Sequence, residues 1–345
     1  RQAVTGQLPD VSYQGLHRQR VFAYRGLAVD LTPFIKAEKG WAGMGYDQAL
    51  LSLGQVKGQQ VGIGFALSTP VIYYNADLMR KAGVEPDRFP MNWDAIMNAA
   101  KKSKAATPGT ESLHVEWDIT GNWMWQVLVF SNGGTMLTAD EKKVAFDGPA
   151  GKAAMLTLEQ LVKQGEMRNI SYSAALQDFV SGKLAVLATT TARLGSITKQ
   201  VGGKFEIRTA RMPVAKDGRL PAGGNAAMMF SKDPAKQAAA WEYIKFATGP
   251  LGATTMVKAT GYFPANTLPA TDPNLLAPFY KANPNHLTAI AQMPVLTGPY
   301  AFPGDNGFKI TDVIKDHLQT VVSQEVQPAV ALSEMSKAVQ ALLPR

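Results

Sequence analysis

The most informative pattern of hydrophobic and polar positions lies between residues 65 and 100. An apolar run rich in β-branched and aromatic residues, Val71 to Tyr74, predicts a buried strand, and Pro70 fits its end because proline cannot donate to a sheet. Asn75 then begins a predicted helix that Gly83 ends. Asn92 predicts the cap of a second helix. The apolar positions of that helix recur at helical spacing and are Trp93, Ile96, Met97 and Ala100.

Strand and helix patterns alternate along the rest of the chain. Further strands are expected at residues 61–65, 113–117, 184–188, 205–208 and 226–230. Helices are expected within residues 123–131, 155–162, 176–180, 233–244, 310–321 and 335–342. Such alternation is typical of an α/β fold with parallel sheets, and a length of 345 residues suggests about two domains.

Four motifs follow one another in an order that resembles a known family. They are Ser68–Asn75, Phe179–Ala185, Gly223–Asn225 and Thr260–Pro264. The set is similar to extracellular solute-binding proteins of family 1, which deliver sugars to ABC importers. It is most similar to the branch that binds glycerol 3-phosphate, and the resemblance covers nearly the whole chain.

The resemblance implies a two-lobed periplasmic binding protein fold with discontinuous lobes and a multi-segment hinge. The chain is expected to cross between the lobes near residues 68–74, 223–227 and 294–303. Lobe 1 would then contain residues 1–73 and 227–300, and lobe 2 would contain residues 74–226 and 301–345. The segment from Gly6 to Val11 resembles the part of the family that leads into the second or third strand of lobe 1. At least one βαβ unit, roughly 30 residues or more, is therefore expected to be missing from the start.

Composition argues against several classes of site. The chain has no cysteine, which rules out disulfides, thiolate nucleophiles and cysteine-ligated metals. The histidines show no metal-ligand spacing, and no phosphate loop, dinucleotide fingerprint or nucleophile elbow is present, so neither a metal nor a cofactor is expected. The net charge is +8 and the pI is about 9.4, but the basic residues are scattered. A nucleic-acid partner is therefore not expected, and nucleic-acid binding is kept only as a weaker alternative.

A site for sugars or polyols needs aromatic faces together with oriented donors and acceptors. Trp117 and Trp123 stand at a predicted strand–loop–helix junction and are candidates for those faces, although a tryptophan can equally fill a core. Gly223 and Gly224 have no Cβ, so the backbone there could approach a solute or act as a hinge. Asn225 completes that motif and is included in the predicted site.

The resemblance implies further ligand-binding residues. Ser68 and Thr69 stand at the first crossover, where their hydroxyls would bond the ligand or merely cap the turn. The resemblance also implies ligand contacts for the run Thr189 to Thr191, which follows a predicted strand, and Thr190 and Thr191 are included in the predicted site. The two remaining members of this set are Tyr262, which resembles the family's cleft tyrosine, and His17, which falls where the family's first loop turns toward the ligand.

The charge of the solute is the open point. Arg193 could neutralise a phosphate or sulfonate, or it could form only a surface salt bridge. The glycerol-phosphate branch holds its phosphate with an arginine in the last crossover, whereas this chain has Asp305 and Asn306 there. Those two side chains suit hydroxyls and repel an anion, so a neutral sugar, a polyol and a glycerol-phosphate-like solute all remain open.

The predicted function is that of a periplasmic, monomeric substrate-binding protein of an ABC importer. It would capture a sugar, polyol or glycerol-phosphate-like solute in the cleft between the lobes by hinge closure, and its other partner would be the membrane permease. It would break no bond. The alternative is a glycan-acting hydrolase, which needs two carboxylates within about 5–10 Å of each other.

Overall fold

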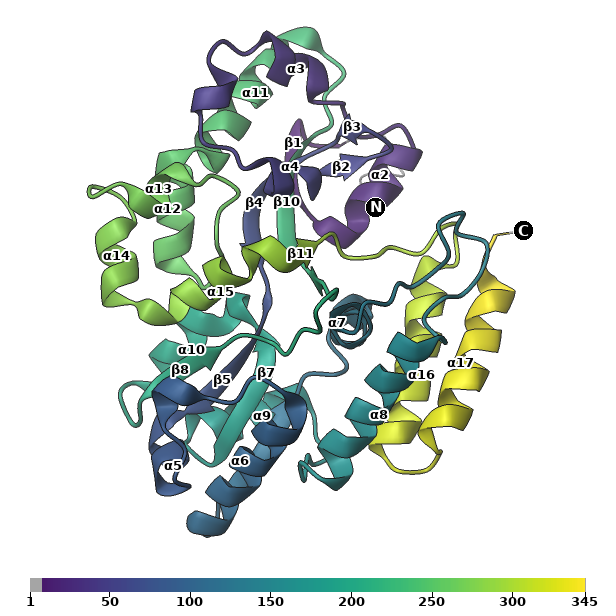
Figure 1. Ribbon diagram of the computed structural model, residues 1–345. Coiled ribbons are helices and arrows are strands. Elements are labelled where there is room, and N and C mark those ends of the chain that lie inside the picture. The colour runs from purple at the N-terminus through teal and green to yellow at the C-terminus, as the bar shows by residue number, and fades with distance from the viewer. Residues whose placement is uncertain (1–7, 345) are drawn as a thin grey trace. The chain divides into compact units, whose positions relative to one another are not determined.

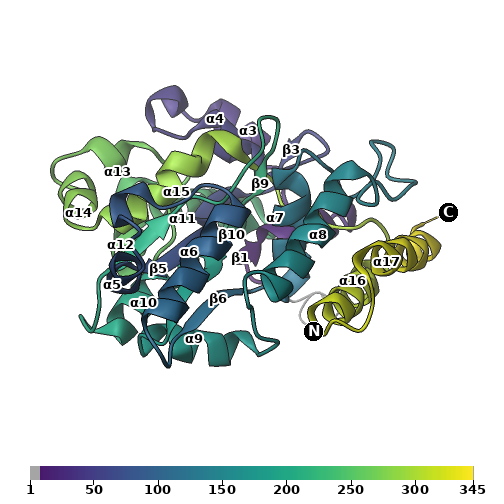
Figure 2. The ribbon, with the colours of Figure 1, turned by 60° about the horizontal axis from the view of Figure 1, so that its bottom comes forward.

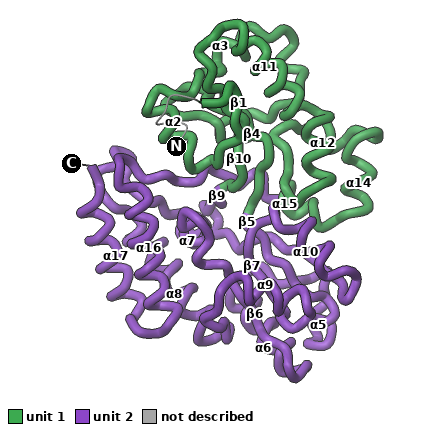
Figure 3. The backbone as a smooth tube through the Cα atoms, turned by 180° about the vertical axis from the view of Figure 1, so that it is seen from behind, with its two compact units in different colours: residues 1–69, 222–290 green, residues 70–221, 291–345 purple. Residues whose placement is uncertain are grey.

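The chain crosses three times between two units, each built from two separate stretches of sequence. A computed structural model describes residues 8–344, so residues 1–7, with which predicted lobe 1 begins, lie outside the described part. The first unit consists of the described residues up to Thr69 and of Ala222–Ile290. The second consists of Pro70–Pro221 and the chain from Ala291 onward (Figure 3).

The first unit is built on an antiparallel sheet with the strand order β1-β10-β4 (Figure 1). The strands of the whole first unit are β1 (Val11–Gly15), β2 (Gln55–Val56), β3 (Gln59–Gln60), β4 (Ile63–Ser68) and β10 (Gly223–Met229). Its helices are η1 (Leu16–Arg18), α2 (Gln19–Tyr24), α3 (Thr32–Ala37), η2 (Trp41–Gly43), α4 (Gln48–Ser52), α11 (Pro234–Thr248), α12 (Pro250–Ala259), α13 (Leu268–Thr271), α14 (Ala277–Ala282), η6 (Pro284–His286) and the start of α15 (Leu287–Gln292). Ile63 and Met229 of this sheet pack against Trp241 and Ile244 of α11, which gives the unit its core.

The second unit is built on a sheet with the strand order β6-β7-β5-β8. The strands of the whole second unit are β5 (Pro70–Asn75), β6 (Glu111–Val115), β7 (Leu184–Thr190), β8 (Ile207–Ala210), β9 (Leu220–Pro221) and β11 (Leu296–Thr297). Its helices are α5 (Ala76–Lys81), η3 (Pro86–Arg88), α6 (Trp93–Ala106), η4 (Thr120–Asn122), α7 (Trp123–Ser131), α8 (Pro149–Lys163), α9 (Tyr172–Val180), η5 (Thr191–Arg193), α10 (Leu194–Val201), η7 (Met293–Val295), α16 (Gly307–Val322) and α17 (Pro328–Leu342). No helix within residues 8–344 is both long and apolar enough to cross a bilayer.

Strand β5 serves two cores of the second unit at once, because successive side chains of a strand point to opposite faces. Ile72 and Tyr74 belong to the core that α6, α7 and α8 complete, whereas Val71 and Tyr73 belong to the core that α9 and α10 complete. Figure 2 shows the sheet between α6 and α9. All residues of β5 are buried, and this explains why its sequence is a continuous apolar run instead of an alternating one.

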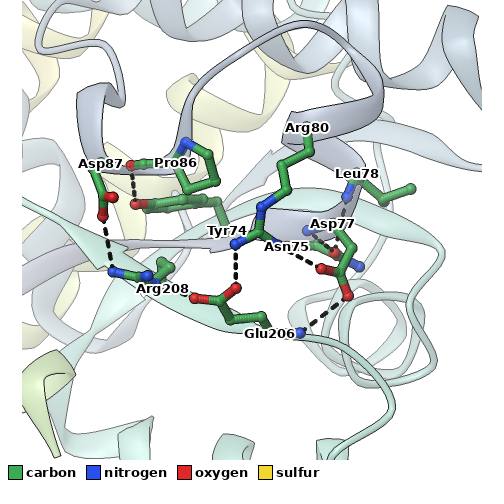
Figure 4. A network of polar contacts seen from close by, with 9 residues as sticks. All are labelled: Tyr74, Asn75, Asp77, Leu78, Arg80, Pro86, Asp87, Glu206 and Arg208. Atoms are coloured by element: carbon green, nitrogen blue, oxygen red, sulfur yellow. Dashed lines mark hydrogen bonds and ion pairs between the residues drawn. The ribbon is translucent and has the colours of Figure 1, made fainter.

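Polar contacts fix the end of β5, as Figure 4 shows. The Asn75 carboxamide oxygen accepts the backbone N–H groups of Asp77 and Leu78, both at 3.1 Å, which confirms the predicted start of α5. The Tyr74 hydroxyl donates to the Pro86 carbonyl at 2.8 Å. The ion pairs nearby are Arg80–Asp77, Arg80–Glu206, Arg208–Glu206 and Arg208–Asp87. These groups are engaged in structure, so this end of the strand offers no set of free polar groups to a solute.

Each observed crossing lies earlier in the chain than its predicted boundary. The sequence places the first after residue 73, yet all of β5 pairs with β7 and β8 of the second unit. The second is predicted after residue 226, yet β10 pairs from Gly223 onward with β4. The third is predicted after residue 300, yet the Gln292 amide already donates to the Pro70 carbonyl at 2.8 Å. The first two boundaries therefore fall next to strand ends, and the third falls within α15, so no boundary cuts through a strand.

The prediction of parallel sheets is wrong for most strands. Among the described residues only β6 with β7 and the short pair β9 with β11 run parallel. Strand β5 runs antiparallel to both β7 and β8, and all pairs of the first unit's main sheet are antiparallel. Periodicity identifies a strand from its own residues. Whether its neighbours run parallel or antiparallel to it depends on how segments distant in the sequence come back to the sheet.

Candidate functional site

Glycines and polar residues of the first unit meet at one end of its sheet. The register pairs Gly223 of β10 with Ser68 of β4, and Asn225 with Gly15 of β1, so two strand ends and one strand start lie side by side. Two hydrogen bonds between the backbones of Leu67 and Phe263, of 2.9 and 2.8 Å, hold the segment after Thr260 against β4. We call this group of predicted residues half-site 1: His17, Ser68, Thr69, Gly223, Gly224, Asn225 and Tyr262.

Half-site 1 combines buried residues with half-buried ones. Ser68 and Thr69 are buried, and the Asn225 side-chain oxygen is buried with no donor among residues 8–344. Burial, with Arg18 as a second cause, lowers the pKa of the His17 imidazole, so the ring is neutral at pH 7. The half-site therefore offers hydroxyls, an amide and a neutral imidazole, and such groups suit a hydroxylated solute.

The structure gives a reason for the glycine at position 224 that the sequence did not reveal. Its φ is +100°, and a Cβ at this position would lie 1.9 Å from the Ala66 carbonyl oxygen of the paired strand. The register also shifts between Asn225 and Ala226, where the strand bulges. The sheet itself thus requires a glycine here, whether or not the backbone also approaches a solute.

Polar residues of the second unit meet where β6 and β7 end. These strands run parallel, so their carboxyl ends share one edge of the sheet. The Glu116 backbone N–H donates to the Ala188 carbonyl at 3.0 Å, and the Thr189 hydroxyl donates to the Glu116 carboxylate. The Tyr73 hydroxyl donates to the Thr190 carbonyl at 2.9 Å. We call the following residues half-site 2: Glu116, Tyr172, Thr189, Thr190, Thr191 and Arg193.

Arg193 is exposed at the edge of half-site 2. Its guanidinium carbon lies 5.5 Å from the centroid of the Tyr172 ring, a cation–π geometry. It forms no ion pair with any residue in the described range 8–344, so the alternative of a surface salt bridge is not what the structure shows. Thr190 caps the turn that leads to it by accepting the Ala192 backbone N–H at 3.2 Å.

Trp117 and Trp123 fill the core of the second unit. Only 6% of Trp117 and 7% of Trp123 is exposed, and both belong to the larger hydrophobic cluster with residues of α7 and α8. Trp123 begins α7, as predicted. The core-filling alternative accounts for their packing, and little ring surface is left for a solute. Their contact with a solute stays a prediction.

Asp305 and Asn306 lie in a different place from half-site 2. They precede α16, and the Asn306 amide donates to the Leu342 carbonyl at the end of α17, at 2.9 Å. Within the described residues, no hydrogen bond or ion pair joins either side chain to Thr190 or Arg193. The Asn306 side chain is therefore engaged with the end of α17, and contact of either residue with a solute stays a prediction.

Glu116 and Tyr172 are the members of half-site 2 that the sequence did not single out. Burial raises the pKa of the Glu116 carboxyl, while the Thr189 hydrogen bond and Arg193 oppose that shift. Burial also raises the pKa of the Tyr172 hydroxyl. The available signal was an acidic residue, Glu116, within the strand predicted over residues 113–117, in the region where the threonines end their own strand. No spacing motif accompanies it.

Sequence comparisons place this chain close to proteins that bind solutes outside the bacterial cytoplasm. A family model described as bacterial extracellular solute-binding protein matches residues 1–288. The sn-glycerol-3-phosphate-binding periplasmic protein of Agrobacterium fabrum is 25% identical over 290 residues. That alignment covers 81% of this chain and 64% of the relative, so the chain spans somewhat less than two thirds of the relative's length.

Solved structures share the fold across almost the whole chain. UgpB from Mycobacterium tuberculosis, in complex with glycerophosphocholine, superposes with a TM-score of 0.83 at 22% identity and covers 99% of this chain and 85% of its own. The cyclic α-maltosyl-1,6-maltose binding protein from Arthrobacter globiformis gives a TM-score of 0.81 at 24% identity, with 99% and 86% covered. The predicted two-lobed periplasmic binding protein fold with discontinuous lobes is thereby confirmed.

Proposed function

This chain belongs to the family of bacterial extracellular solute-binding proteins, and on that premise we propose that it is the solute receptor of an ABC importer. It captures a sugar, polyol or glycerol-phosphate-like solute and delivers it to the membrane permease. One solute contacts both half-sites, and because those contacts form together, binding favours closure of the two units.

The observation that carries the proposal is the presence of one polar half-site on each unit. Half-site 1 gathers at the end of the sheet that contains Ser68 and Asn225. Half-site 2 gathers at the edge where Thr190 ends β7 and Glu116 follows β6. Ligands of α/β proteins bind beyond the ends of strands, where side chains and free backbone groups converge. Hydroxyl, amide and carboxyl groups dominate both sets, which matches a hydroxylated solute.

The relatives support this range of solutes. One is named for sn-glycerol 3-phosphate, one structure contains glycerophosphocholine, and another protein is named for a cyclic maltosyl-maltose. These solutes share hydroxyl groups but differ in charge. The proposal therefore extends to the hydroxylated class and leaves the charge to be argued from this chain's own residues.

We propose binding without chemistry. A glycan hydrolase requires a pair of carboxylates, and within residues 8–344 Glu116 is the one acidic residue that is buried. Its neighbour Asp118 is exposed. The proteins named in the comparisons are binding proteins, so nothing there favours the hydrolase alternative.

The same family membership supports a location outside the cytoplasm, and we propose the periplasm. A monomer is the expected state, because a receptor that presents both units to a permease needs no second copy. Nucleic acid is not proposed as a partner, since the excess of lysine and arginine is spread along the chain.

The test is a binding screen with the full chain. Thermal shift and calorimetry with glycerol, maltose, sn-glycerol 3-phosphate and glycerophosphocholine should identify a solute that raises the melting temperature, because it binds only the folded state. Asn225→Ala in half-site 1 and Thr190→Val in half-site 2 should each weaken binding about 3- to 10-fold, the value of one hydrogen bond.

The matched control is Thr255→Val, which removes an exposed hydroxyl from α12 and should leave affinity unchanged. Failure of all four solutes to bind would overturn the proposal. Binding that responds to only one of the two half-site variants would overturn the claim that one solute contacts both. Release of glucose from maltose would favour the hydrolase.

A further inference from the structure

Half-site 2 contains a buried carboxylate that forms no ion pair within the described residues. Glu116 is 6% exposed, and the Thr189 hydroxyl donates to one of its carboxylate oxygens, Oε2. Within residues 8–344, no hydrogen bond reaches the other oxygen, Oε1, and no lysine, arginine or histidine forms an ion pair with Glu116. Buried acids are almost always paired, so an unpaired one requires an explanation.

A second polar group, the Tyr172 hydroxyl, lies beside Glu116. It is buried close to the Thr189 hydroxyl, and no hydrogen bond of good geometry reaches it from the described residues. Two side chains, Glu116 just after β6 and Tyr172 at the start of α9, therefore bring polar atoms to the same strand end. Buried polar groups left unpaired in this way point to a missing partner that can both donate and accept.

The chemistry of these groups discriminates between the solutes that the proposed function leaves open. A carboxylate only accepts hydrogen bonds, so it pairs with a hydroxyl of a sugar or polyol. A phosphate ester brings acceptor oxygens and negative charge to the same place, and the carboxylate repels it. Arg193 could attract such an anion, but its guanidinium is exposed and stacked on Tyr172, whereas Glu116 is buried, where charge effects are larger.

We propose that Glu116 is a specificity-determining residue that accepts a hydrogen bond from a hydroxyl of the solute, with Tyr172 and Thr189 beside it, and that the solute is a neutral sugar or polyol instead of a phosphate ester. This inference rests on the proposed function. Glu116 acts as an acceptor and a charge filter, and it takes part in no reaction.

Glu116→Gln separates these roles from a merely structural one. The amide keeps the shape of the side chain and an oxygen for Thr189 but removes the charge. Affinity for the neutral probe, maltose or glycerol, should fall about 10-fold, since hydrogen bonds to charged groups are the stronger ones. Affinity for sn-glycerol 3-phosphate should rise, because the repulsion is gone. A residue that only supports the fold would not move the two affinities in opposite directions.

Glu111→Gln is the matched control. Glu111 begins β6, the strand that Glu116 follows, and pairs with Lys104 at 3.3 Å at the end of β6 away from the threonines. It should leave both affinities unchanged. Should Glu116→Gln fail to fold, the inference can still be tested with Thr189→Val and with the unaltered chain. The unaltered chain should already bind maltose or glycerol more tightly than sn-glycerol 3-phosphate.

Dependence on pH gives a second measurement. The groups facing Glu116 are Arg193 of η5, Tyr172 of α9, Thr189 of β7 and Asp118 after β6. Burial raises the pKa of the Glu116 carboxyl, and a hydroxyl donor favours its ionised form, so affinity for the neutral probe should fall as the pH is lowered through that pKa. Glu116→Gln should flatten this dependence.

Three results would overturn the inference. Tighter binding of sn-glycerol 3-phosphate or glycerophosphocholine than of every neutral probe would do so while leaving the proposed function intact. Equal maltose or glycerol affinity in Glu116→Gln and the unaltered chain would also do so. If no probe binds at all, the proposed function fails, and the inference fails with it.

Discussion

Replacing Gly224 by alanine tests the structure of half-site 1 most directly. The backbone at this glycine has a φ of +100°, and the added Cβ would lie 1.9 Å from the Ala66 carbonyl oxygen. An ordinary contact requires about 3.4 Å, so β10 and β4 would have to separate locally by roughly 1.5 Å. The bulge after Asn225 would then no longer hold its register.

The expected cost has two parts. A non-glycine residue at such a φ costs about 1–3 kcal/mol, and the separation weakens one or two strand hydrogen bonds at about 1 kcal/mol each. We therefore expect Gly224→Ala to reduce the free energy of unfolding by about 3 kcal/mol. Gly203→Ala is the control, since its φ is +80° but no atom lies within 4 Å of the added Cβ, so only strain of about 1 kcal/mol remains.

Urea unfolding followed by circular dichroism measures both variants. With a slope of about 2 kcal/mol per molar urea, the midpoint for Gly224→Ala should move by about 1.5 M. A loss for Gly224→Ala no larger than that for Gly203→Ala would refute the argument, because the contact with Ala66 would then have no energetic consequence. Loss of solute binding without loss of stability would instead assign Gly224 to the solute.

Three further predictions concern the second unit and the pH response. Trp123→Ala should reduce the free energy of unfolding by about 3–5 kcal/mol, because the indole is 7% exposed; a loss below 1 kcal/mol in urea would contradict the packing described. Burial lowers the pKa of His114 and of His286 to about 4, so unfolding takes up protons below pH 6.5. The free energy of unfolding should therefore fall as the pH is lowered from 6.5 to 4, by up to about 1.4 kcal/mol per pH unit for each histidine. His114→Leu should reduce that slope, and an unchanged slope in urea titrations at several pH values would count against it. Glu206→Gln should cause only a small loss of stability that disappears in 1 M NaCl, since its partners are partly exposed; a large, salt-independent loss would be inconsistent with this.

The sequence predicted those elements whose residues carry their own signal. Helix α7 begins and ends where its apolar run does, and β5 extends the predicted Val71 to Tyr74 run by one residue at each end. Such runs are decided locally, by apolar residues that must be buried and by caps such as Asn75.

Strand direction and the content of half-site 2 depend on distant contacts. Thr189 and Thr190 extend β7 beyond the predicted end because they pair with β5. The Thr189 hydroxyl bonds to Glu116, and the Thr190 carbonyl accepts the Tyr73 hydroxyl. Nothing local shows that partnership. Asp305 was assigned by its position in a motif, but the turn into α16 lies beside the end of α17, and the motif's order alone did not reveal this.

Strand β5 has a consequence for how the second unit opens. Since its odd and even residues belong to different cores, a slip by one residue would exchange the two sets and disrupt both cores at once. Its amide hydrogens should therefore exchange with solvent only through global opening of the unit. The Tyr73 hydroxyl links this slowest-opening strand to Thr190, so the threonine edge is anchored to the most persistent part of the unit.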